Sequence, residues 1–143
     1  MANPLVISVL RELLSAEQRS IAPRLMESTV FVSQLSVHEF EALRRSAKST
    51  LANERQLTEL IVSLGGSPGP RAADVMTADL HFLEVHFVVP KLLADREALI
   101  RKCAAGASKL AREPRALPAV VAILERNRVE FAELERVLGA RAT

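Results

Sequence analysis

Residues 36–70 read SVHEFEALRRSAKSTLANERQLTELIVSLGGSPGP, and this stretch decides the fold class. It opens with Ser36 and Glu39 at the spacing of a capping box, in which each side chain accepts a hydrogen bond from a backbone N–H at the helix start. A Gly-Gly pair and two prolines follow Leu64 and end the helix, because Gly adopts the left-handed C-cap conformation and Pro cannot continue a helix. Between the two signals, a row of mostly apolar residues recurs every three or four positions, which is the spacing of one face of a helix. We therefore predict one long amphipathic helix over 37–64.

The same helical spacing continues on both sides of this stretch, and no segment alternates with a period of two. The sequence therefore predicts an all-α protein without strands. Asn3 and Pro4 are typical of an N-cap and a first helical position. Pro23 and Pro90 each remove one backbone hydrogen bond and predict kinks in the first and third helices. The four predicted helices cover residues 4–32, 37–64, 78–111 and 118–138.

The lengths of the connections predict the topology of these helices. The first and third connections are short, which makes the helices that they join antiparallel neighbours. The second connection, residues 65–77, is long enough to run the length of a bundle when extended. We therefore predict one domain over 1–143: a four-helix bundle of two antiparallel pairs joined by one long crossover, with the second and third helices parallel.

The composition excludes several classes of protein. The 143 residues are 49% hydrophobic and 25% charged, which is typical of one globular domain and not of a disordered chain. A formal charge of +2 and the absence of Tyr and Trp argue against a nucleic-acid partner. Charged residues interrupt every long apolar run, so no membrane span is expected. A single cysteine and no evident secretory signal favour a cytoplasmic protein.

Each predicted helix carries polar side chains among its inward-facing positions. These residues are Glu17 in the first helix, Thr50 and Glu54 in the second, Glu84 in the third, and Asn127 with Glu130 one turn on in the fourth. Burying charge without a partner is costly, so polar groups at one level of a bundle need a common explanation. One explanation is a metal site built from facing helices. The other is a network with basic side chains, for which Arg24, Arg55, Lys91 and Arg128 are near enough in register.

Residues 10–17, LRELLSAE, resemble the first-helix segment of the ferritin-like superfamily, which includes bacterioferritin and rubrerythrin and in which this segment ends on a metal-ligating Glu. The Gly-Gly turn after Leu64 is similar to the turn that closes the second helix of that family. Together with the long crossover, the resemblance covers nearly the whole chain at the level of helix layout. It implies a ferritin-like bundle in which Glu17 and Glu84 correspond to the carboxylate ligands of the first and third helices.

Two of the family's ligand motifs are broken in this chain. The Glu-x-x-His of the second helix falls on Thr50 and Asn53, and that of the fourth on Asn127 and Glu130. The other possible registers, Glu54 with Leu57 and Glu125 with Arg128, also lack His. Asn and Thr do not supply the bridging anionic oxygens that hold two dications. We therefore expect a bundle that has lost its di-iron centre and binds no cofactor.

The alternative is an iron-binding or di-iron protein with a reduced carboxylate site. Its metal ligands would be Glu17, Glu54, Glu84 and Glu130.

The sequence favours a protein that is not an enzyme, because it contains no phosphate-binding glycine loop, activated nucleophile or zinc spacing.

The expected role is therefore structural, or the binding of another protein. The third helix carries apolar residues around nearly its whole circumference, Val85 and Val89 among them, which is more than one core buries. We predict a homodimer through this helix. Cys103 precedes a run of small residues and is expected to be a small buried hydrophobe.

Overall fold

Helices make up all of the regular structure in residues 3–72 and 84–142, which are the ranges that the computed structural model describes. No strand occurs within these ranges, in agreement with the predicted all-α class. The helices are α1 (Pro4–Gln18), α2 (Ala22–Met26), α3 (Thr29–Val32), α4 (Val37–Ser63), α5 (Val85–Lys109), α6 (Leu117–Leu138) and a closing 3-10 turn, η1 (Gly139–Ala142).

The helices predicted over 37–64 and 118–138 are confirmed to within one residue by α4 and α6. At the start of α4, the Glu39 N–H donates to the Ser36 hydroxyl at 3.2 Å, and the Ser36 N–H donates to the Glu39 carboxylate at 2.8 Å. At its end, Gly65 has a φ of +84° and the Gly66 N–H donates to the Ile61 carbonyl at 2.9 Å. Local sequence signals therefore set both ends of α4.

The single kinked helix predicted over 4–32 is wrong, because the chain breaks twice and forms α1, α2 and α3. Pro23 lies in the first turn of α2, where its missing N–H costs no helical hydrogen bond. The first break is held by Asp95 of α5, whose carboxylate accepts from the Ser20 hydroxyl at 2.9 Å and from the Ile21 N–H at 3.4 Å. The Ser28 side chain caps α3 and begins the next helix after the second break.

The third predicted helix, 78–111, is only partly described. Residues 78–83 lie outside the described residues, and α5 begins at Val85 and ends at Lys109. Pro90 lies inside α5, and the helix continues through it. The location of Pro90 inside this helix agrees with the prediction.

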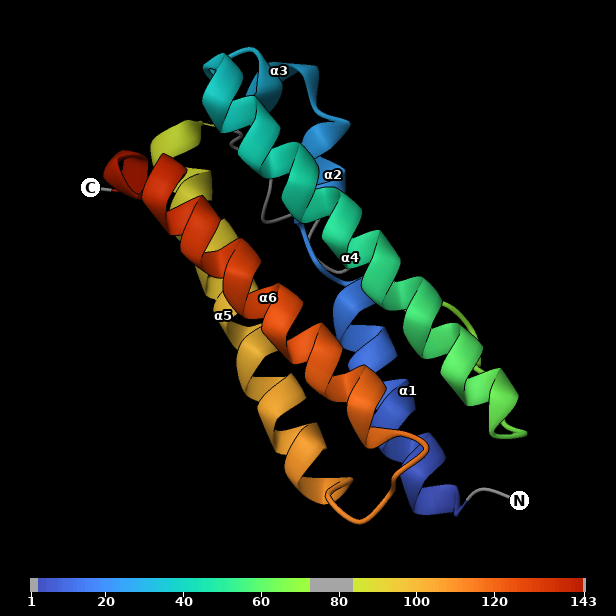
Figure 1. The fold of residues 1–143 in the computed structure, drawn as a ribbon. Coiled ribbons are helices and arrows are strands. Elements are labelled where there is room, and N and C mark those ends of the chain that lie inside the picture. The colour runs from blue at the N-terminus through green and yellow to red at the C-terminus, as the bar shows by residue number, and fades with distance from the viewer. Residues whose placement is uncertain (1–2, 73–83, 143) are drawn as a thin grey trace.

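The four longest helices pack side by side, and α2 adds a further contact with α4 (Figure 1). Both α1 and α6 contact α4 and α5. In Figure 1, α1 and α6 run in one direction while α4 and α5 run in the other, so α4 and α5 are parallel.

The apolar core divides into two clusters that are separated by polar residues. One cluster contains Leu10, Leu14, Leu57, Ile61 and Ile123, and the other contains Ile21, Leu25, Phe31, Val89 and Leu134. Between the clusters lie six polar residues that are at most 1% exposed. We call them the polar layer: Glu17 of α1, Ser46, Thr50 and Asn53 of α4, Arg96 of α5 and Asn127 of α6.

The apolar surface on which the homodimer prediction depended is mostly buried within the single chain. Val85 and Val89 are 1% and 0% exposed and belong to the core cluster that includes residues of α2, α3 and α6. Phe87 remains 45% exposed, with the Lys91 ammonium 5.0 Å from its ring centroid. The expectation that Val85 and Val89 form a contact surface is wrong, because these other elements cover them. The oligomeric state itself stays a prediction.

A buried polar layer as the candidate functional site

Arg96 lies at the centre of the polar layer and is fully buried. Its Nη1 donates to Asn127 Oδ1 at 2.6 Å. Its Nη2 donates to the Ser46 carbonyl oxygen and to Thr50 Oγ1, each at 2.9 Å, and to the Ser46 hydroxyl. One guanidinium on α5 therefore joins α4 and α6 through hydrogen bonds, which are stronger when the donor is charged.

Glu17 is the buried carboxylate of the layer, and it is 1% exposed. Its Oε1 accepts from Asn53 Nδ2 at 3.2 Å, and its Oε2 accepts from Asn127 Nδ2 at 3.0 Å. Asn127 thus accepts from the Arg96 guanidinium with its oxygen and donates to Glu17 with its nitrogen. The Asn127 amide connects the buried cation to the buried anion.

The electrostatics of this pair follow from burial. Desolvation raises the pKa of Glu17, and the hydrogen bond from Asn127 and the charge of Arg96 oppose that rise. Desolvation also lowers the pKa of Arg96, and the charges of Glu17 and Asp95 oppose it. Each of the two charges therefore offsets part of the cost of burying the other.

Arg126 and Glu130 lie at the edge of the layer on α6. Arg126 Nε donates to Asn53 Oδ1 at 2.8 Å, and the same guanidinium binds Gln56. Glu130 is half-buried, and desolvation raises its pKa against the charge of Arg96. One of its carboxylate oxygens is buried without a hydrogen-bond partner in the described part of the chain.

The predicted site residues have different positions in the structure. Glu17 lies inside the layer and Glu130 at its edge, but Glu54 forms an ion pair with Arg71 at 2.8 Å. Glu84 is exposed as the N-cap residue of α5, so the prediction that it faces inward at mid-bundle is wrong. In the described ranges, no three Asp, Glu, His or Cys side chains come together as a group that would hold a metal ion. The four predicted ligands do not form a set.

The structure supports the second explanation of the inward polar residues, a hydrogen-bonded network, for Glu17 and its amide partners. It does not support the basic residues that were predicted to take part. Thr50, Asn53 and Asn127 all belong to the layer. Of the basic residues expected to bridge, Arg128 pairs with Glu125 at 2.7 Å on the surface, and Lys91 lies over the ring of Phe87. The buried cation of the layer is Arg96, and Arg126 donates to Asn53 from its edge.

Arg96 carries a signal that sequence reasoning did not use. Leu92, Leu99 and Cys103 are buried at helical spacing on α5, and Arg96 falls between them one turn after Leu92. A charged residue within such a stripe is the same signal that singles out Glu17 on the first helix. An Arg at this position indicates a buried partner of opposite charge.

Cys103 is buried beside the layer, as predicted, with Asn127 Nδ2 at 3.6 Å from its Sγ. Burial raises the pKa of its thiol to about 12 from the ordinary 9.0. The unfolded thiol therefore ionises first, and the free energy of unfolding should fall by about 1.4 kcal/mol per pH unit between these two values. Urea unfolding across this range should show the decline, and a Cys103→Ala variant should lack this part of it.

The same burial predicts a thiol that does not react while the protein is folded. Iodoacetamide at mildly alkaline pH should modify Cys103 only after urea is added. Modification of the native protein at the rate seen in urea would contradict the buried position of Cys103.

The donor set of the layer does not fit a di-iron centre. Such a centre uses carboxylates and imidazoles from all four helices, whereas this layer supplies one carboxylate with amides, hydroxyls and a guanidinium. A guanidinium offers only N–H donors and a positive charge, so it repels a metal cation. What the arrangement does chemically is to hold four helices together with a charge-compensated hydrogen-bond network.

Comparison with family models, with curated proteins and with solved structures gives no match for this chain. None of the helices in the described ranges combines the length and the apolarity needed to cross a membrane.

Proposed function

We propose that this chain is a ferritin-like bundle in which a guanidinium takes the place of the metal ions, and that it acts as a structural or binding protein without di-iron chemistry. The observation that carries the proposal is the fully buried Arg96, which donates to α4 and α6 at the centre of the polar layer. A fixed positive charge there opposes the binding of dications.

The ferritin-like part of the proposal is supported by which residues meet in the layer. Glu17, Thr50, Asn53 and Asn127 are the positions that the resemblance aligns with ligands of the first, second and fourth helices, and all four share one network. The parallel course of α4 and α5 in Figure 1 also agrees with a bundle that contains one long crossover.

A filled interior leaves the surface to carry the function. The layer is closed to solvent, and its polar atoms are largely used in contacts between helices. A protein of this kind acts through what binds to its outer faces, which include both self-association and a different protein partner.

The proposal is tested by metal analysis of the full chain. The protein is expressed in iron-rich medium, purified without chelator beside a di-iron protein as a positive control, and its metal content is quantified. We expect no stoichiometric iron in this chain, because the guanidinium of Arg96 occupies the centre of the layer. About two tightly held iron atoms per chain would overturn the proposal.

A further inference from the structure

The oxygens that accept hydrogen bonds from the guanidinium of Arg96 lie on helices other than its own. Arg96 belongs to α5, whereas its acceptors are Asn127 Oδ1 of α6 and, on α4, Thr50 Oγ1 with the carbonyl and hydroxyl of Ser46. The carboxylate that most offsets the burial of its charge, Glu17, belongs to α1. Three helices therefore surround the guanidinium, and α5 supplies only the cation and its tether.

Contacts that do not involve Arg96 hold these acceptors in place. Asn127 Nδ2 donates to Glu17 at 3.0 Å, which fixes the direction of the oxygen on the same amide. Thr50 Oγ1 donates to the Ser46 carbonyl at 3.2 Å, so these two atoms stay together on one face of α4. A site whose groups are already oriented loses less entropy when a ligand binds. We therefore expect the acceptors to keep their positions when the side chain of residue 96 is shortened.

The tether makes no polar contact in this site. Arg96 Nε is buried without a hydrogen-bond partner in the described part of the chain, so the nitrogens that bind are the terminal Nη1 and Nη2. Two oxygens on the same helices as the acceptors are also buried without a partner among the described residues: Ser49 Oγ, beside Thr50, and Glu130 Oε2, one turn after Asn127. A free guanidinium ion has the two terminal nitrogens and an NH2 group in place of Nε. It can therefore keep the hydrogen bonds of Arg96 without the tether.

The charge and the shape of the site favour a planar cation. The charges of Glu17, Asp95 and Glu130 each oppose the fall in the pKa of Arg96 that burial causes, so three carboxylates favour a cation here. Removing the side chain of Arg96 takes away the cation that offsets the burial of Glu17, which favours the entry of another cation. The acceptors are arranged around two nitrogens of one planar group, which suits a guanidinium better than an ammonium ion.

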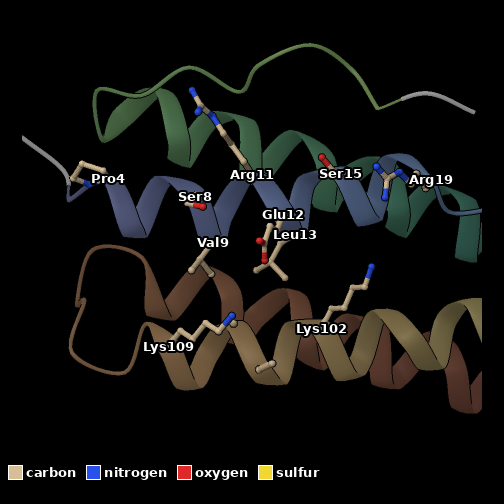
Figure 2. A pocket seen from close by; sticks show the side chains of 12 residues that line it. Pro4, Ser8, Val9, Arg11, Glu12, Leu13, Ser15, Arg19, Lys102 and Lys109 are labelled. Carbon is tan, nitrogen blue, oxygen red and sulfur yellow. The ribbon is translucent and has the colours of Figure 1, made fainter.

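The site is closed to solvent in the native protein. A hollow of about 590 Å³ lies between α1 and α5, and Figure 2 shows its lining, which includes Glu12, Leu13 and Lys102. Within the described ranges, this lining contains no residue of the polar layer. The residues of the layer are also at most 1% exposed. A free ligand therefore reaches the layer when the chain opens, as it does during a thermal melt.

We propose that α1, α4 and α6 form a binding site for a guanidinium ion, that Arg96 is the tethered ligand of this site, and that a free guanidinium ion binds there when residue 96 is shortened. The class of ligand is a small planar cation with N–H groups along its edge. This inference rests on the proposed function, in which a guanidinium takes the place of metal ions, and it adds that the site recognises the guanidinium itself.

The test is the thermal unfolding of Arg96→Ala, followed by circular dichroism, with and without guanidinium chloride at about 20 mM. Binding to the folded state should raise the Tm of this variant by at least about 2 °C. The unaltered chain has no free site, so its Tm should not rise, because guanidinium otherwise acts as a denaturant. If Arg96→Ala does not fold in buffer, guanidinium should restore its helical signal on refolding.

Two control ligands separate charge from shape. Urea is planar and neutral, whereas ammonium is charged and not planar. Neither ligand at about 20 mM should raise the Tm of Arg96→Ala by more than about 0.5 °C.

Two control variants locate the site. Arg96→Met keeps most of the cavity filled, and Arg101→Ala removes an exposed guanidinium from the same helix. Guanidinium should raise the Tm of neither variant, because neither has an empty site in the layer.

Three results would overturn the inference. They are a failure of guanidinium to raise the Tm or restore the folding of Arg96→Ala, an equal effect of urea or ammonium, and an equal rise in Arg96→Met or Arg101→Ala. The metal analysis of the unaltered chain is independent of all three. An iron-free chain whose Arg96→Ala variant does not respond to guanidinium would refute this inference alone.

Discussion

Replacing Arg96 with Ala is expected to lower the free energy of unfolding by about 3–5 kcal/mol. The change removes the cation that offsets the burial of Glu17, together with the hydrogen bonds that it donates to the Ser46 carbonyl and to Asn127 Oδ1. It also leaves a cavity in a fully buried place. Equilibrium unfolding in urea, followed by circular dichroism, measures the loss.

The matched control for this variant is Arg101→Ala on the same helix. Arg101 is exposed and pairs with Glu97 at 3.7 Å, so its removal should cost no more than about 1 kcal/mol. Equal stability of the Arg96 and Arg101 variants would show that the guanidinium of Arg96 does not hold the layer together.

Glu17→Leu is expected to have the second large effect, a loss of about 3–5 kcal/mol. Leu removes the carboxylate that most offsets the burial of the Arg96 cation, and it removes the acceptor that Asn53 and Asn127 share. Glu17→Gln should cost less, because Gln keeps one carbonyl oxygen for one of these amides. Thermal and urea unfolding of both variants measure the difference.

Glu12→Leu is the control for Glu17→Leu, because Glu12 is an exposed carboxylate on the same helix. Its stability should stay within about 0.5 kcal/mol of the original protein. A Glu17→Leu protein with an unchanged melting temperature would mean that Glu17 faces water, which contradicts the buried layer.

The helices that local signals define were predictable from the sequence. A capping box at Ser36 and Glu39 and a left-handed Gly65 set the ends of α4 without help from the rest of the chain. The region 4–32 was not predictable in this way. Its first break depends on Asp95, which lies on another helix and binds Ser20 and the following residue. A proline marks a weak point in a helix, and in this chain a contact with another helix holds the break.

The candidate site was predictable for three helices and missed on the fourth. Inward stripes that are otherwise mostly apolar identified Glu17, Thr50 and Asn127, and the stripe of the second helix also contains Glu54. On the third helix apolar residues occupy nearly all sides, so no single inward-facing stripe is evident. Glu84 was predicted to face inward because the expected metal ligand is a carboxylate. In the structure the buried charged residue of α5 is Arg96, which lies three turns after Glu84 and has the opposite charge. A positive charge at this position repels a metal cation, whereas a carboxylate would bind one.

The central claim is that Arg96 and Glu17 compensate each other across Asn127, and a double-mutant cycle tests it most directly. The cycle compares Arg96→Ala, Glu17→Leu and the double variant by urea unfolding. We predict that the double variant loses at least about 1 kcal/mol less than the sum of the single losses, because neither uncompensated charge remains in it. Losses that add to within about 0.5 kcal/mol would contradict the claim, since they would show that the two side chains do not interact.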